Sequence, residues 1–174
     1  MIEFKSDIVL KGSLWKQALD KISFMFPKPE NVPNYSVFIL SLAIGILYDK
    51  AYDSAGADEE VDEKISVPRT VLIKRSDCIN DLFQAAIINS KTINNTIKER
   101  KELAFADSTN IAFNKTEFLL KFANFGVTKL LDIIGDDNIT SMQDLSDFIE
   151  KTFKGYNFEI GSISSDDLDI EDLK

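Results

Sequence analysis

The chain has 174 residues, of which 44% are hydrophobic and 28% charged, and its 29 acidic and 20 basic side chains give a net charge of −9. This composition is typical of a globular protein rather than a disordered or fibrous one, and the length suits one compact domain. The chain has no histidine, which excludes imidazole bases, Ser-His-Asp triads and zinc sites that contain histidine. Its single cysteine excludes an internal disulfide.

The acidic excess is concentrated in two segments, residues 53–64 and 156–174. Each carries six acidic side chains and one lysine and therefore nets −5, whereas the rest of the chain carries 17 acidic and 18 basic side chains. Burying such runs would desolvate unpaired carboxylates, so we expect a solvated loop and a solvated tail. The chain is thus divided into a helical domain, residues 1–155, and an acidic, flexible tail, residues 156–174.

The tail also has an apolar component, because its acids alternate with Leu168, Ile170 and Leu173. One interpretation is a tail that only adds solubility. A second is that these three side chains bind a basic, apolar groove of a partner protein. A third is that the carboxylates imitate DNA phosphates and inhibit a DNA-binding enzyme.

Two helices are predicted in the first third of the chain. Ser13 is expected to cap a helix that ends at Pro27, and Asn34 to cap a second helix that ends near residue 52. The second helix is apolar on nearly every face, so it should cross the middle of the domain. Gly45, within it, would let another backbone approach closely.

A short sheet is expected beside these helices. Residues 1–10 alternate loosely between apolar and polar, and residues 65–74 are rich in β-branched side chains. Pro68 forbids a central strand position, because proline cannot donate to a ladder of hydrogen bonds. The two segments therefore predict an edge strand or a two-stranded ribbon.

The rest of the chain shows helical spacing again. A helix begins near Ser76, and Asn114 to Glu117 has the form of a capping box before a helix that we expect Gly126 to end. Thr140 to Gln143 has the form of a second capping box, before a helix that Gly155 ends. The apolar side chains expected to face the core from this last helix are Leu145, Phe148, Ile149 and Phe153. The predicted fold is mainly α, with five or six helices and one or two minor strands.

Neither a membrane segment nor a signal peptide is predicted. The most apolar stretch, Val37 to Tyr48, has 12 residues, whereas a bilayer needs about 20. The first ten residues mix charged with apolar side chains, unlike a signal peptide. Together with the lone cysteine, these features favour a reducing, bacterial-type cytoplasm.

The side chains able to carry chemistry are not grouped. Asp132, Asp136 and Asp137 flank a glycine but lack the spacing of a calcium-binding loop. Cys78 has no readable neighbouring base and is expected to be a buried structural thiol. The glycines do not cluster in the sequence, so no glycine-rich phosphate-binding loop is predicted. We therefore predict no catalytic, cofactor-binding or metal-binding residues, and a protein that is not an enzyme.

A basic segment lies between Arg69 and Lys101. Its cations would form a phosphate-binding patch if the extended segment and the turn at 98–101 fold side by side. The alternative is an ordinary solvated surface. The candidate nucleic-acid-binding residues are Arg69, Lys74, Arg75, Lys98, Arg100 and Lys101.

Four stretches within residues 35–134 resemble a known family. They are Val37-Phe-Ile-Leu-Ser-Leu-Ala-Ile-Gly45, Ile65-Ser-Val-Pro68, Asp81-Leu-Phe83 and Phe118 to Leu131. The pattern resembles the Dnd system-associated small proteins, found with bacterial DNA phosphorothioation and related anti-phage defence islands. In the last stretch Phe122 replaces the family's tyrosine. After the first stretch, Leu47, Tyr48 and Asp49 replace basic residues.

The resemblance implies an accessory subunit that works beside larger ATPase or nuclease components. The leading hypothesis is therefore a non-enzymatic accessory subunit of a bacterial anti-phage defence complex, docked on such a partner. The first alternative is a nucleic-acid-binding module that uses the basic residues between 69 and 101. The second is an acidic inhibitor of a DNA-binding enzyme.

Overall fold

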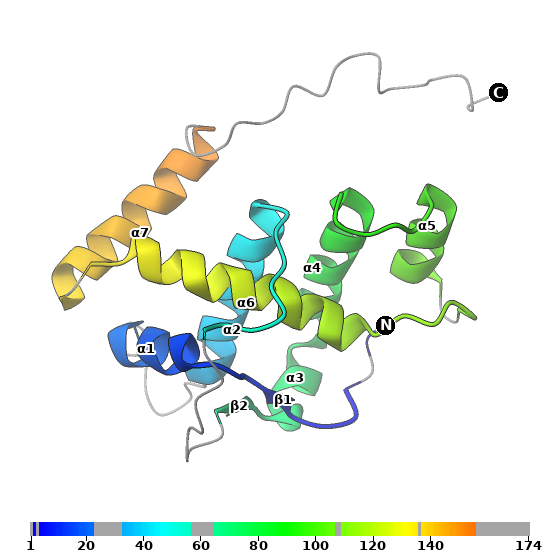
Figure 1. Ribbon diagram of the computed structural model, residues 1–174, viewed down its shortest axis with the longest axis horizontal. Coiled ribbons are helices and arrows are strands. Elements are labelled where there is room, and N and C mark those ends of the chain that lie inside the picture. The colour runs from blue at the N-terminus through cyan, green and yellow to red at the C-terminus, as the bar shows by residue number, and fades with distance from the viewer. Residues whose placement is uncertain are drawn as a thin grey trace.

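The computed structural model describes residues 2, 4–22, 33–56, 65–106, 109–135 and 137–155. These residues form seven helices and one small sheet (Figure 1). The elements are β1 (Ile8–Val9), α1 (Ser13–Ile22), α2 (Pro33–Leu47), β2 (Ser66–Val67), α3 (Arg69–Lys74), α4 (Ser76–Asn89), α5 (Ile97–Phe105), α6 (Lys115–Ile133) and α7 (Asn138–Phe153). The prediction of a mainly helical protein is confirmed. The predicted tail, residues 156–174, and most of the acidic loop lie outside the described residues.

Helices α2 and α6 cross at the centre of the molecule, and two glycines set the distance between them (Figure 1). A Cβ atom on Gly126 would lie 1.6 Å from the carbonyl oxygen of Ser41, and one on Gly45 would lie 2.0 Å from that of Phe122. The close approach predicted at Gly45 is confirmed. The prediction that Gly126 ends a helix is wrong, because this glycine lies inside α6. Its lack of a side chain lets the backbone of α2 approach closely and does not form a turn.

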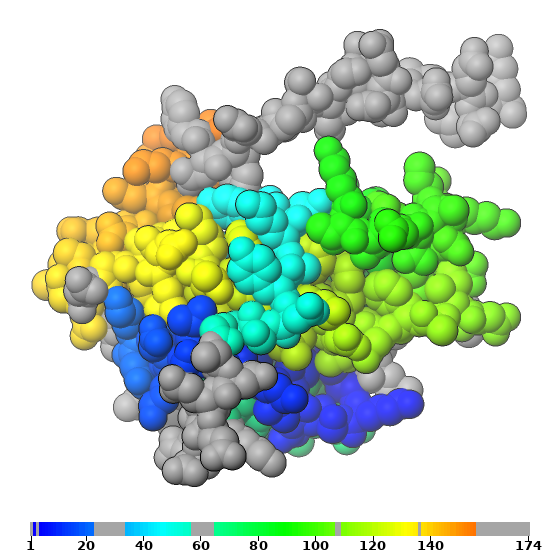
Figure 2. All heavy atoms as spheres, in the orientation of Figure 1, coloured from blue at the N-terminus to red at the C-terminus, as the bar shows by residue number. Residues whose placement is uncertain are grey.

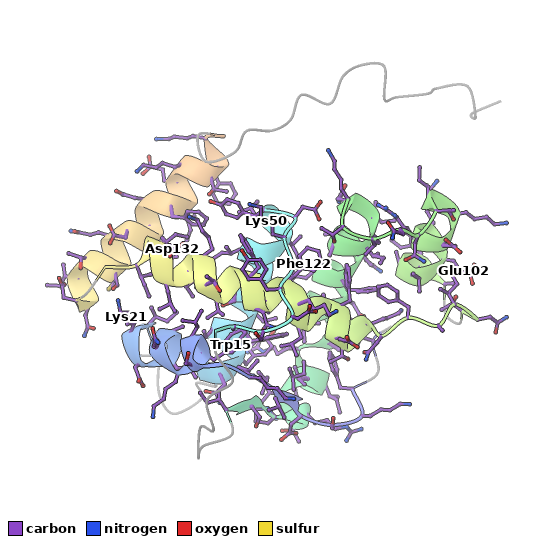
Figure 3. All side chains as sticks on the ribbon, in the orientation of Figure 1. Trp15, Lys21, Lys50, Glu102, Phe122 and Asp132 are labelled. Carbon is purple, nitrogen blue, oxygen red and sulfur yellow. The ribbon has the colours of Figure 1, made fainter. Side chains whose placement is uncertain are left out.

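The core packs around this crossing. Trp15 of α1 and Phe122 of α6 are buried in the interior (Figure 3). The indole Nε1 of Trp15 donates to Oδ1 of Asn124 at 3.2 Å, and Nδ2 of Asn124 donates to the carbonyl oxygens of Tyr52 and Asp53 at 3.2 Å each. The buried side-chain amide of Asn124, on α6, therefore forms hydrogen bonds to α1 and to the segment after α2.

Strands β1 and β2 pair antiparallel, with Ile8 opposite Val67, so the predicted two-stranded ribbon is confirmed. The prediction of extended chain as far as Lys74 is wrong, because α3 begins directly after Pro68. Pro68 has extended dihedrals, and its carbonyl oxygen accepts the first hydrogen bonds of α3. The proline that ends the strand thus also starts a helix, which buries Leu72.

Two predicted helix caps have different outcomes. Asn114 caps α6 as expected, since its Oδ1 accepts the N–H of Glu117 at 3.1 Å. Asn34 does not cap α2, which begins at Pro33 and ends at Leu47 rather than near residue 52. Its Nδ2 instead donates to the carbonyl oxygen of Ser66 at 2.8 Å and links α2 to the sheet.

Candidate protein-docking surface

The last helix, α7, has well-defined ends. The carboxylate of Asp137 accepts the N–H groups of Thr140 at 3.0 Å and Ile139 at 2.9 Å, and these bonds, with one from the Thr140 hydroxyl, hold its pKa below the ordinary value. The prediction that the helix starts at Thr140 is wrong, because Asp137 caps the free N–H groups of the first turn. Gly155, with a φ of +75°, follows the helix and ends it as expected.

One face of α7 packs on the body of the protein. Ser141 is buried and its hydroxyl donates to the carbonyl oxygen of Gly135 at 3.0 Å. Lys21 of α1 donates to the same oxygen at 3.4 Å (Figure 3). Leu145 and Phe148 are half-buried against the core. These contacts hold α7 against α1 and α6.

A second apolar face of α7 is exposed. Ile139, Met142, Ile149 and Phe153 have 71%, 57%, 43% and 87% of their surface exposed. Together with Ser146 they occupy positions spaced by 3, 4, 3 and 4 residues, which at 100° per residue lie within an arc of about 80°. We call these five residues the α7 stripe. The prediction that Ile149 and Phe153 face the core is wrong, because only Leu145 and Phe148 do so.

The α7 stripe lies at one end of the molecule. Figure 1 shows α7 beyond the C-terminal end of α6 and on the opposite side of the body from α5. Figure 2 shows α7 along the outer edge of the molecule. A partner could therefore approach α7 without disturbing the crossing of α2 and α6.

The free edge of the stripe carries charged side chains of both signs. One edge is occupied by the body of the protein, and the other carries Asp147 and Glu150, both exposed. Lys154 lies one turn after Glu150 and forms an ion pair with it. Lys151 and Lys154 line the same hollow as Asp147 and Glu150, so two basic side chains accompany the two acidic ones here. Within α7 as a whole, three acidic side chains and one lysine give a net charge of −2.

The structure does not bring the six predicted nucleic-acid-binding residues together. Arg69, Lys74 and Arg75 lie on or next to α3, and the other three lie on α5, at a distance in Figure 1. Arg69 is engaged within the fold, since its Nε donates to the carbonyl oxygen of Phe4 at 2.7 Å and its N–H donates to Asp7. These two bonds hold residues 4–7, the N-terminal arm, against the start of α3.

Arg100 also has a structural role. Its guanidinium donates to the carbonyl oxygens of Ser90, Ile93 and Asn95 and fixes the loop between α4 and α5. A capping box that the sequence analysis missed, formed by Thr96 and Glu99, starts α5 next to this loop. Lys98 and Lys101 remain exposed on the outer side of α5.

The predicted partner-binding residues of the tail, Leu168, Ile170 and Leu173, lie outside the described residues. The α7 stripe, which the described part of the chain does contain, was missed. Its signal was present in the sequence, because α7 has more apolar positions than one buried face can use. The sequence alone did not show which of the two apolar faces is covered.

Cys78 is exposed, so the prediction of a buried thiol is wrong. Its position in the first turn of α4 turns the side chain outward, beside Tyr35. The pKa of Tyr35 is raised to about 12, chiefly by burial of its hydroxyl and further by Cys78. A phenol with such a pKa stays protonated near neutral pH and does not act as a base for the thiol.

Lys115 is the one amine among the described residues whose pKa is lowered, and burial is the cause. Its Nζ donates to the carbonyl oxygen of Leu103 at 3.0 Å and lies 4.8 Å from the centre of the Phe83 ring. These contacts anchor α6 to the end of α5. They leave the amine engaged in packing rather than directed at a substrate.

Two open hollows flank Phe113 and Asn114. One, of about 570 Å³, lies against the N-terminal arm, and the other, of about 440 Å³, lies against α6. At the second, Lys121 forms ion pairs with Asp53 at 2.9 Å and Glu117 at 3.6 Å. Within the described ranges no three acidic or cysteine side chains converge as metal ligands would.

None of the helices that the structure describes is both long enough and apolar enough to cross a bilayer. Comparison with protein-family models, curated protein sequences and solved structures finds no match. The resemblance to the Dnd-associated proteins therefore stays a prediction. The fold and site define a small helical protein that presents an exposed apolar helix face.

Proposed function

We propose that this protein is a non-enzymatic accessory subunit of a bacterial anti-phage defence complex, which docks through the α7 stripe on a larger ATPase or nuclease. The observation that carries the docking role is the exposure of four large apolar side chains on one face of α7. The defence context comes from the sequence resemblance over residues 35–134.

Exposed apolar surface of this extent supports a docking role. The four side chains leave on the order of 500 Å² uncovered, which is within the range at which apolar patches on monomers are often functional. At about 25 cal/mol per Å², covering them would contribute about 12 kcal/mol before the costs of association.

The charges beside the stripe are mixed. Two acidic and two basic side chains line one hollow at its free edge, so the matching surface is apolar with charges of both signs at its rim. The choice of an ATPase or nuclease as the partner comes from the sequence resemblance.

The experiment is a pull-down of the tagged full chain from its native host, at low and moderate salt, after nuclease treatment. Wild type is compared with the double variant Ile149→Ser/Phe153→Ser. The matched control is Asp144→Ser/Lys151→Ser, which changes two residues on the opposite side of α7 and leaves the net charge unchanged.

We expect a stoichiometric ATPase or nuclease that mass spectrometry identifies and that remains bound at moderate salt. It should be lost with the stripe variant and retained with the control. Recovery of nucleic acid alone, released at moderate salt, would contradict the proposal. Equal capture by all three proteins would contradict the role of α7.

A second candidate function is binding of single-stranded nucleic acid by α5. Lys98 and Lys101 are exposed there, and Phe105, on the same side of the helix, has 65% of its surface exposed. Bases stack on exposed aromatic rings that are flanked by cations. This function predicts binding of an oligonucleotide that weakens steeply with salt and falls with Lys98→Ala/Lys101→Ala, measured by fluorescence anisotropy.

A further inference from the structure

We infer that the hollow against α6 binds an arginine side chain of another protein. This hollow, the second of the two beside Phe113, has a volume of about 440 Å³, which lies within the range of ligand pockets. Its walls are the segment after α2, the loop between α4 and α5, the loop before α6 and the first half of α6. Helix α7 is not one of these walls, so the site is independent of the proposed docking through the α7 stripe.

Aromatic rings form the floor of the hollow. Phe113 is half-buried, and Phe118 and Phe122 are buried. The ring centre of Phe118 lies 5.2 Å from that of Phe113 and 4.9 Å from that of Phe122, so the three rings pack as a row. The half-buried ring of Phe113 is thereby fixed by its neighbours. A planar guanidinium stacks on such a ring.

The rim of the hollow carries two carboxylates and one ammonium. Nζ of Lys121 lies 2.9 Å from Oδ1 of Asp53 and 3.6 Å from Oε1 of Glu117, so one cation is shared by two anions. The hydrogen bond to Asp53 and the charges of both carboxylates raise the pKa of Lys121. These three are the charged side chains that line the hollow. One negative charge therefore remains uncompensated at the rim.

Asp53 supplies a free acceptor in a fixed position. Its Oδ2 atom has no partner within the described part of the chain, whereas Oε2 of Glu117 accepts a bond from Nδ2 of Asn114 at 3.1 Å. The backbone around Asp53 is held on α6, because its carbonyl oxygen accepts Nδ2 of Asn124 at 3.2 Å. The N–H of Tyr52 also donates to the carbonyl oxygen of Lys121 at 2.9 Å.

This combination favours arginine over other ligands. A guanidinium is planar and weakly hydrated, so it can stack on Phe113 while its N–H groups donate to Asp53. An ammonium is compact and strongly hydrated and gains less from an aromatic floor. An acidic group or a phosphate would be repelled by the uncompensated negative charge. Asp53 is also the first residue of the segment 53–64, which nets −5 and attracts basic proteins at longer range.

The experiment titrates the isotope-labelled full chain with N-acetyl-arginine methylamide and follows the backbone amide signals by NMR. N-acetyl-citrulline methylamide is the matched probe, because it has nearly the same shape and no charge. Free arginine is the third probe and represents the amino acid itself. The variants are Asp53→Asn/Glu117→Gln and Lys121→Gln. The matched control is Asp132→Asn, which removes a carboxylate of α6 that pairs with Lys129 away from the hollow.

In the wild type we expect saturable shifts from the arginine methylamide at the amides of residues that line the hollow. Citrulline methylamide should bind at least tenfold more weakly, because it lacks the charge that the rim attracts. Free arginine should bind no more tightly than the methylamide, since its own carboxylate is repelled by the rim. The residues whose amides should shift most are Asp53, Ile93, Phe113 and Glu117.

The variants should change the affinity in opposite directions. Asp53→Asn/Glu117→Gln should weaken binding of the arginine methylamide at least fivefold, because it removes both carboxylates. Lys121→Gln should strengthen binding at least threefold, because it frees both carboxylates from their present cation. Asp132→Asn should leave the affinity within twofold of the wild type. Circular dichroism verifies that each variant remains folded.

Three results would overturn the inference. They are equal binding of the arginine and citrulline probes to the wild type, an affinity that the rim variants do not change, and tighter binding of free arginine than of the blocked probe. The last result would assign the hollow to the amino acid rather than to a protein side chain. None of these results bears on the pull-down through α7, so the two proposals fail separately.

Discussion

The crossing of α2 and α6 and the outer helix α7 use apolar residues in opposite ways. At the crossing, Gly45 and Gly126 have no side chains, so two backbones meet, and both glycines are buried. On α7, Ile139, Met142, Ile149 and Phe153 are exposed. Both helices that pack at the crossing belong to this chain, whereas α7 carries an apolar face that the described part of the chain does not cover.

The largest expected effect lies at the crossing. Gly126→Val would place a branched side chain where even a Cβ atom is 1.6 Å from a backbone oxygen, so the helices would have to separate. We expect a loss of at least about 3 kcal/mol in the free energy of unfolding, measured by urea denaturation. Gly155→Ala is the control, because its Cβ meets no atom within 4 Å and only its positive φ opposes the change. Equal losses at both positions would refute the account of the crossing.

The buried amide of Asn124 comes next. Asn124→Ala leaves the Trp15 N–H and two carbonyl oxygens without their partner, and we expect a loss of about 2–3 kcal/mol. A double-mutant cycle with Trp15→Phe, followed by thermal denaturation, isolates the bond between the two side chains. The double variant should lose less than the two single losses added together. Strict additivity would show that this bond contributes nothing.

The two apolar faces of α7 should differ in a direct comparison. Leu145→Ser, on the inner face, should cost about 1–2 kcal/mol, because it removes a packed side chain. Ile149→Ser, four residues along on the outer face, should change the free energy of unfolding by less than about 0.5 kcal/mol. Urea denaturation measures both. A large loss at Ile149 would mean that the stripe supports the fold rather than docking.

The smallest expected effect is the pH dependence of the α7 cap. The pKa of Asp137 is lower in the folded protein than the unfolded value of about 3.9. Its contribution to stability is therefore fully present above about pH 4 and is lost as the pH falls through the folded pKa. Asp137→Asn keeps a capping oxygen but cannot titrate, so its melting temperature should fall less than that of wild type between pH 6 and pH 3. Identical falls would show that this carboxylate does not contribute.

Local signals in the sequence were sufficient for several elements. Asn114 caps α6 and Gly155 ends α7, because each depends on the dihedral preferences or hydrogen bonds of a few neighbouring residues. The predominance of helix follows from the 3.6-residue spacing of the apolar positions, which is also local.

Contacts between distant segments decided the rest. Glycine is typical of the position after a helix, so the sequence predicts an end at Gly126. Only the backbone of α2, which packs against Gly126, explains the glycine at this point inside α6. Arg69 was predicted to bind phosphate, and only the fold shows that its Nε donates to the carbonyl oxygen of Phe4. In α7 the sequence determines two apolar faces, and the tertiary structure decides which one is buried. A residue's spacing is a property of its own helix, whereas its burial depends on what packs against that helix.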